Sequence, residues 1–155
     1  MNRTEKLREY IDGVLLEMTD AEDRRCAYLH LYSVSIIAAM IAMKRGENAE
    51  LAAIAGMLHD FYTYANTDMA DYAYKGAAFS RGGLEKLDIV NKDELGAICS
   101  AIYHHSDKSV TDEPFDEVLK DAGVLQHCLY NVTLPVMPHE VLRFESLKNE
   151  FGLKG

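Results

Sequence analysis

An unbroken apolar stretch of eight residues, LAAIAGML, covers residues 51 to 58, and His59 and Asp60 follow it directly. A helix that is apolar on every side belongs in the interior of a protein. An aspartate at its C-terminal end is unfavourable, because the helix dipole repels it and burying a lone charge costs several kcal/mol. A bound cation would offset both penalties, and imidazole is itself a common metal ligand. The stretch therefore predicts a central buried helix that ends in a metal site.

Apolar residues recur at helical spacing along most of the remaining chain, and no β-strand is expected. Thr4, Asp20, Asn48 and Asn91 have the side chains of helix N-caps, and Gly46 suits a helix C-terminus. The predicted helices cover residues 4–18, 21–45, 48–61, 68–79, 91–106, 114–131 and 139–151, with a turn at Gly82-Gly83. This pattern predicts an all-α bundle.

Composition favours a single soluble domain. The chain has 155 residues, 48% of them hydrophobic, and carries a formal net charge of -9. That charge argues against binding a nucleic-acid polymer, which needs clustered basic residues. No apolar run approaches the roughly 18 residues of a membrane span, and the N-terminus lacks the apolar core of a signal peptide. The three cysteines form no CxxC pair, so we expect reduced thiols and a cytoplasmic location.

No repeat or linker indicates a second domain. We therefore expect one domain over residues 1 to 155, with a core at about 20–132 and a C-terminal helix at about 138–151. The sequence leaves open whether the chain acts as a monomer or as a homodimer.

Two further polar side chains fall on apolar helical faces. His30 lies in a stripe formed by Cys26, Ala27, Val34, Ile37 and Ile41. Asp121 lies in a stripe formed by Val118, Val124, Leu125 and Cys128. A buried carboxylate or imidazole needs a partner. Asp116 and Lys120, by contrast, are assigned to a polar face of the same helix.

Three predicted helices thus offer His30, His59 with Asp60, and Asp121 to the interior. Two imidazoles and two carboxylates suit a divalent first-row metal such as Fe, Mn, Zn, Ni or Co. The set has too much oxygen for a structural zinc site, which prefers cysteine.

Four segments carry a resemblance to a known family: HLYSVSIIAAMIA, AAIAGMLHD, AIYHHSD and KDAGVLQ. In this order they are similar to the first helix, the namesake motif, the histidine-bearing segment and the closing Asp-Ala-Asp of the HD superfamily of metal-dependent phosphohydrolases. The resemblance covers most of residues 25 to 130. It implies an all-α bundle in which His30, His59, Asp60 and Asp121 hold the metal. The metal would lower the pKa of a bound water, which Asp60 would orient, and would draw charge off a phosphoryl oxygen.

Three positions depart from the family pattern. Thr63 stands where many members have a lysine, Tyr72 where binuclear members often have a histidine, and Gly123 where the second aspartate of the closing motif is usual. The missing histidine argues for one metal rather than two. Without this lysine, the chain lacks the residue that usually assists catalysis in the family.

Two adjacent histidines are candidates for the chemistry. His104 and His105 end a predicted helix, where the dipole favours a protonated imidazole. They are either a helix-end pair or place one histidine at the pocket mouth, acting on phosphate or as a proton donor. The family pattern favours His105.

Several other polar residues are candidates for holding the substrate. Lys75, Arg81 and Arg25 are candidates for the phosphate, although an exposed surface charge is the simpler interpretation of each. Tyr72 and its neighbouring tyrosines would line a pocket that stacks a base, or else would only pack. His127 and His139 are expected to be exposed, without a role.

The sequence thus predicts a metal-dependent phosphohydrolase, a phosphomonoesterase or phosphodiesterase, that acts on a small phosphorylated molecule. A nucleotide is the substrate class that the resemblance implies. Three alternatives stay open: a catalytically inactive module that binds metal and nucleotide, a structural protein whose polar core residues pair with one another, and a di-iron oxygenase. Tyr72 disfavours the last, because that chemistry needs two metals.

Overall fold

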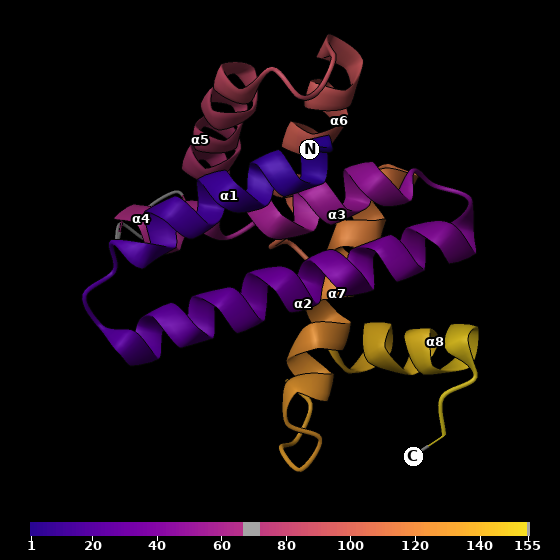
Figure 1. The fold of residues 1–155 in the computed structure, drawn as a ribbon. Coiled ribbons are helices and arrows are strands. Elements are labelled where there is room, and N and C mark those ends of the chain that lie inside the picture. Colours follow the sequence, from indigo (N-terminus) through magenta and orange to yellow (C-terminus); the bar gives the residue numbers. More distant parts are fainter. Residues whose placement is uncertain (67–71, 155) are drawn as a thin grey trace.

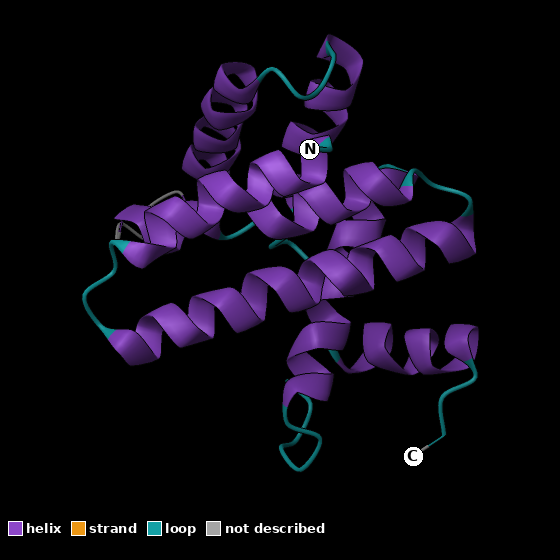
Figure 2. Ribbon diagram, viewed as in Figure 1, coloured by secondary structure: helices purple, strands orange, loops and turns teal. Residues whose placement is uncertain are grey.

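A computed structural model describes residues 1–66 and 72–154 of the chain. Within these ranges the ordered segments are helical and no strand occurs (Figure 2). The eight helices are α1 (Arg3–Leu16), α2 (Ala21–Arg45), α3 (Ala49–Leu58), α4 (Phe61–Asn66), α5 (Tyr72–Leu87), α6 (Lys92–His104), α7 (Pro114–Tyr130) and α8 (Val141–Phe151). The prediction of an all-α fold is confirmed.

Helices α2 and α3 form the centre of the molecule. α3 packs against α2 on one side and α6 on another, and α7 crosses α2 and contacts α3 (Figure 1). Every residue of α3 from Ile54 to Leu58 is buried, as expected for a helix that is apolar all round. The end of α3 therefore lies where α2, α6 and α7 meet.

One glycine lets α2 and α3 approach closely. A Cβ added at Gly56 would lie 2.6 Å from the backbone Cα of Ser35, so no larger residue fits without moving a helix. The Ser35 hydroxyl donates a hydrogen bond to the Ala53 carbonyl across the same contact, at 2.9 Å. This contact holds His30 of α2 in register with His59.

Most helix ends lie where the sequence predicts them. The side chains of Asp20, Asn48 and Asn91 accept hydrogen bonds from the first turns of α2, α3 and α6. Gly46 ends α2 at a φ of 76°, in the left-handed region that glycine tolerates. The cap of α1 is a correction, because Asn2 rather than Thr4 accepts the hydrogen bond from Glu5.

The predicted turn at Gly82-Gly83 is wrong, because α5 runs through both glycines. Gly83 packs against α1, where an added Cβ would lie 3.4 Å from the Tyr10 ring. Gly83 is therefore needed at this contact for its small size, and it does not form a turn. The central helix is also shorter than predicted, since α3 ends at Leu58 and the short helix α4 begins at Phe61.

The predicted polar face of α7 is buried as well. Asp116 is 2% exposed and accepts hydrogen bonds from Ser100 and His104. Lys120 is fully buried and forms ion pairs with Asp112 and Glu117. The two residues do share a polar face, but this face is buried, because the α6–α7 connection folds back over Lys120 and α6 packs against Asp116.

One helix of the described chain, α2, is long and apolar enough to cross a membrane by length and composition. Core helices of soluble proteins meet the same criterion. In the described structure α2 packs against α1, α3, α4 and α7.

Candidate metal centre

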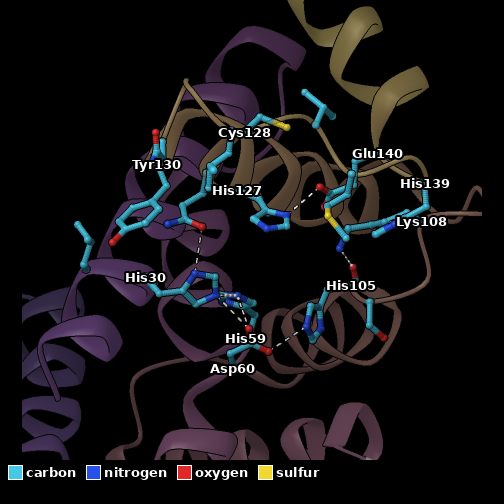
Figure 3. A pocket seen from close by; sticks show the side chains of 18 of the residues that line it. His30, His59, Asp60, His105, Lys108, His127, Cys128, Tyr130, His139 and Glu140 are labelled. Atoms are coloured by element: carbon cyan, nitrogen blue, oxygen red, sulfur yellow. Dashed lines mark hydrogen bonds and ion pairs between the residues drawn. The ribbon is translucent and has the colours of Figure 1, made fainter. Parts of the chain in front are cut away.

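Three polar side chains converge where α3 ends. His30 Nε2 lies 3.0 Å from His59 Nε2 and 3.0 Å from Asp60 Oδ2. His59 Nε2 lies 3.2 Å from the same carboxylate oxygen (Figure 3). His59 is the C-cap of α3, and Asp60 follows it in the short link to α4. The sequence prediction that these three residues meet is consistent with this geometry.

Hydrogen bonds at the other ring nitrogen orient both imidazoles. His59 Nδ1 lies 2.7 Å from the Gly56 carbonyl oxygen, which can only accept, so Nδ1 carries the proton. His30 Nδ1 lies 3.0 Å from the side-chain oxygen of Gln126, which accepts in the same way. With protons on Nδ1, the Nε2 lone pairs of both rings point at one another and at Asp60.

This arrangement suits a bound cation. Two Nε2 lone pairs and a carboxylate oxygen repel one another at about 3 Å, unless a proton or a metal ion lies among them. Imidazole nitrogens oriented by Nδ1–H donation are the usual form of histidine ligands to metals. All three ligand atoms lie within 4.8 Å of one another, so a single ion can contact them together. We conclude that His30, His59 and Asp60 fit a divalent metal ion.

The electrostatics keep the donors in the forms that a metal needs. Burial lowers the pKa of His59, which favours the neutral imidazole. Burial alone would raise the pKa of Asp60, but its contacts with His59, His105 and His30 together hold it well below its usual range. Asp60 is therefore ionised at neutral pH.

The structure separates the two adjacent histidines of the α6 C-terminus. His105 is buried, donates from Nδ1 to the Ile102 carbonyl, and places Nε2 3.2 Å from Asp60 Oδ1. His104 turns the other way and lies 2.9 Å from Asp116. Only His105 joins the cluster. The catalytic role predicted for His104 does not fit its position.

Asp121 does not reach the cluster, which corrects the prediction of a second carboxylate ligand. Its two oxygens accept hydrogen bonds from Arg45 at 2.8 Å and from Arg143 at 3.0 Å. Arg143 belongs to α8, and Arg45, at the end of α2, also pairs with Glu150 of α8. Asp121 is thus a buried ion-pair partner, and the α7 side chain that contacts the metal cluster is Gln126.

A cavity of about 700 Å³ opens above the cluster. His30, His59, Asp60 and His105 lie at its base. Part of its wall is apolar and aromatic, formed by Leu29, Tyr64, Tyr130, Leu134, Val136 and Met137. Polar residues form the rest, including Lys108, Gln126, His127, His139 and Glu140.

Sequence reasoning did not find the polar residues of the cavity wall. His127 and His139 were expected to have no role, yet both line the cavity, and His127 bonds Glu140 at 2.8 Å. Lys108 and Glu140 come from the segments before α7 and before α8. Helical periodicity does not apply to such segments, so it could not place Lys108 and Glu140 at the cavity. Of this group only His127, which lies on α7, could have been placed by helical spacing.

The predicted phosphate-binding cations lie elsewhere. None of Lys75, Arg81 and Arg25 lines the cavity. Arg81 pairs with Glu85 along α5, and Arg25 pairs with Glu22 along α2. The side chain of Tyr72 lies outside the described part of the structure.

Comparisons with known proteins show the family and the fold of the chain. The model of the HD domain family matches residues 27–131 of the chain. A solved structure of a predicted HD superfamily hydrolase from an uncultured Thermotogales bacterium aligns with a TM-score of 0.62 and 20% identity, covering 98% of this chain and 95% of that one. At this identity the likeness shows the fold. No curated protein matches the chain. With the family model matching well over half of its length, the chain belongs to the HD domain family.

Proposed function

We propose that the protein is a metal-dependent phosphohydrolase that acts on a small phosphorylated molecule, with a nucleotide as the favoured substrate class. Membership of the HD domain family supports hydrolysis, and the cavity has room for a small organic phosphate. The apolar wall with Tyr64 and Tyr130 supports a substrate with a planar organic part.

The observation that carries the proposal is the convergence of two oriented imidazoles and an ionised carboxylate at the base of this cavity. When bound, a divalent metal lowers the pKa of a coordinated water and withdraws charge from a phosphoryl oxygen. His30 and His59 supply neutral nitrogen ligands, and Asp60 supplies the negative charge.

His105 is suited to move a proton. Its Nδ1 donates to the Ile102 carbonyl, and its Nε2 lies 3.2 Å from Asp60 Oδ1 at the base of the cavity. From this position it would donate a proton to the leaving oxygen of a phosphate ester.

The test is elemental analysis of protein purified without chelators or an affinity tag, beside the Asp60→Asn variant. We expect about one equivalent of a transition metal in the parent and none in the variant. Hydrolysis of nucleoside monophosphates and p-nitrophenyl phosphate, assayed with that metal restored, should fall at least about 100-fold in the variant.

Asp121→Asn is the matched control, since it removes a carboxylate charge on α7 that does not touch the cluster. It should retain metal and activity. Absence of metal from the parent after soaking, or equal hydrolysis by Asp60→Asn, would show that the proposal is wrong.

A second candidate is an inactive module that binds metal and nucleotide. Thr63 favours it, because this residue brings no cation to the site and its hydroxyl donates to the backbone carbonyl of Asp60 at 2.7 Å. Tight nucleotide binding by the metal-loaded protein, with no product after hours, would support this candidate.

A further inference from the structure

One of the α7 positions that face the cavity has no side chain. Gly123 lines the cavity, whereas Asp121, two residues earlier, points toward α8. The resemblance to the closing Asp-Ala-Asp puts its second aspartate at this glycine. A Cβ built on Gly123 would meet a single neighbouring side chain, Lys108, whose Nζ lies 3.7 Å away. An ammonium thus occupies the space next to the place where a carboxylate would extend.

Lys108 has an incompletely used ammonium group. Its Nζ donates to the His105 carbonyl, the one hydrogen-bond partner that it has among the described residues (Figure 3). No carboxylate oxygen of residues 1–66 and 72–154 lies within 4.0 Å of it. An ammonium carries three donors, so two are left for a ligand in the cavity. The negative charges of Asp60 and Glu140 act on it from a greater distance, and burial lowers its pKa.

The balance of charge at the base favours an anion. The cavity lacks the carboxylate that the closing motif would bring and has gained a cation next to that position. With a divalent metal on His30, His59 and Asp60, the site has a net positive charge. A dianionic phosphoryl group, with several strong acceptor oxygens, would match it.

We propose that Lys108 is the substrate-anchoring residue of this cavity, binding a phosphoryl oxygen from the space that Gly123 leaves open. The inference rests on the proposed function and adds to it the residue that selects the charged group. Lys108 and Tyr130 lie on opposite sides of the cavity (Figure 3). The ester therefore binds with its phosphoryl group toward Lys108 and its organic part toward Tyr130.

The experiment measures binding of inorganic phosphate to the metal-loaded protein by isothermal titration calorimetry. Lys108→Met should weaken binding at least about tenfold, while metal content and thermal unfolding stay as in the parent. Lys108→Arg should retain most of the affinity. Lys92→Met is the charge-matched control, because Lys92 is exposed at the start of α6, and it should bind phosphate as the parent does.

Gly123→Asp tests the same idea from the other side. The new carboxylate would lie next to Lys108, neutralise it, and weaken phosphate binding as Lys108→Met does, without loss of metal. A Lys108→Met variant that binds phosphate like the parent would overturn the anchoring role. The same holds if Lys108→Arg binds phosphate no more tightly than Lys108→Met. A metal-loaded parent that binds no phosphate would overturn it too. Failure of the proposed function has a different signature, because the parent would then hold no metal, or would bind metal and phosphate without hydrolysing phosphate esters.

Discussion

At the scale of single residues, the orientation of each imidazole depends on an acceptor behind it. For His59 that acceptor is a backbone carbonyl, which no side-chain substitution removes. For His30 it is the side chain of Gln126. The two imidazoles therefore differ in how easily their orientation can be disturbed.

Gln126→Leu removes the acceptor for His30 and should weaken metal affinity about 10- to 100-fold, because the ring loses its fixed tautomer and direction. Gln126→Glu keeps an acceptor oxygen and should bind metal at least as well as the parent. Competition against a chelator of known affinity measures both. Equal losses in the two variants would argue that Gln126 acts only through packing.

The buried His59 gives the metal-free protein a defined response to pH. Its pKa in the folded state is lowered from the ordinary 6.5, so the unfolded chain takes up the proton first as pH falls. The stability that His59 contributes is complete above pH 6.5 and is lost as pH falls below it, by at most about 1.4 kcal/mol per pH unit.

Urea unfolding of the metal-free parent and of His59→Gln, between pH 7.5 and 5, measures this contribution. The parent should lose more stability than the variant over this interval, because glutamine does not titrate. Identical pH dependence in the two proteins would mean that His59 is not neutral when buried.

The sequence identified the members of the cluster that interrupt clear apolar patterns. His30 and His59 stand out because one helical face around each is apolar. Asp121 was misplaced because α7 is buried on several sides, so an apolar neighbourhood does not indicate which interior it faces. Residues 121 and 123 project in roughly opposite directions on a helix, and only the fold decides which of them reaches the cavity.

At the scale of the helices, Gly56 sets the distance between α2 and α3. Gly56→Ala would place a methyl group 2.6 Å from the Ser35 backbone, which cannot move without the whole of α2. We expect a loss of about 1–3 kcal/mol in unfolding free energy, as for other overpacked cores. Metal affinity should fall too, because His30 moves with α2 and His59 with α3.

Gly82→Ala is the control. Gly82 lies inside α5 with nothing within 4 Å of an added Cβ, so alanine there should stabilise the protein by about 0.5–1 kcal/mol. Urea denaturation measures both variants. If Gly56→Ala were as stable as the parent, the helix contact would be more adaptable than the structure indicates.

Helix boundaries were predictable where a side chain or a glycine itself makes the end. The Asn91 side chain caps α6, and the Asn91 backbone N–H donates in turn to the Glu94 carboxylate, a local interaction that the sequence displays directly. The glycines of α5 led to the wrong prediction of a turn, because Gly83 allows close packing against Tyr10, which is distant in the sequence. Local pattern cannot distinguish a glycine that turns the chain from one that admits a neighbour.

At the scale of the whole molecule, an ion-pair network attaches the C-terminal helix to the core. Arg45 of α2 bonds Asp121 of α7 and Glu150 of α8, and Arg143 of α8 bonds Glu117 and Asp121. α8 also packs through the buried Leu147 and through Phe144 and Phe151, which lie partly buried against the core. Its attachment therefore combines ion pairs with apolar contacts.

Asp121→Asn should therefore lower the unfolding free energy by about 1–3 kcal/mol, since two partly buried arginines lose a charged partner. The loss should change little at high salt, because largely buried ion pairs are screened much less than exposed ones. Thermal unfolding at low and high ionic strength measures it, and metal analysis of the same samples should show no change. A loss of metal would instead indicate that Asp121 is a metal ligand.

The base and the rim of the cavity belong to different kinds of structure. The base comes from the ends of α3 and α6 and from α2, whereas much of the rim comes from the connection between α7 and α8, including Leu134, Val136 and Met137. Connections of this sort accept substitutions and length changes that packed helices do not. Evolution can thus alter which molecules the cavity admits while the chemistry at its floor is inherited unchanged, and relatives with the same ligands need not share a substrate.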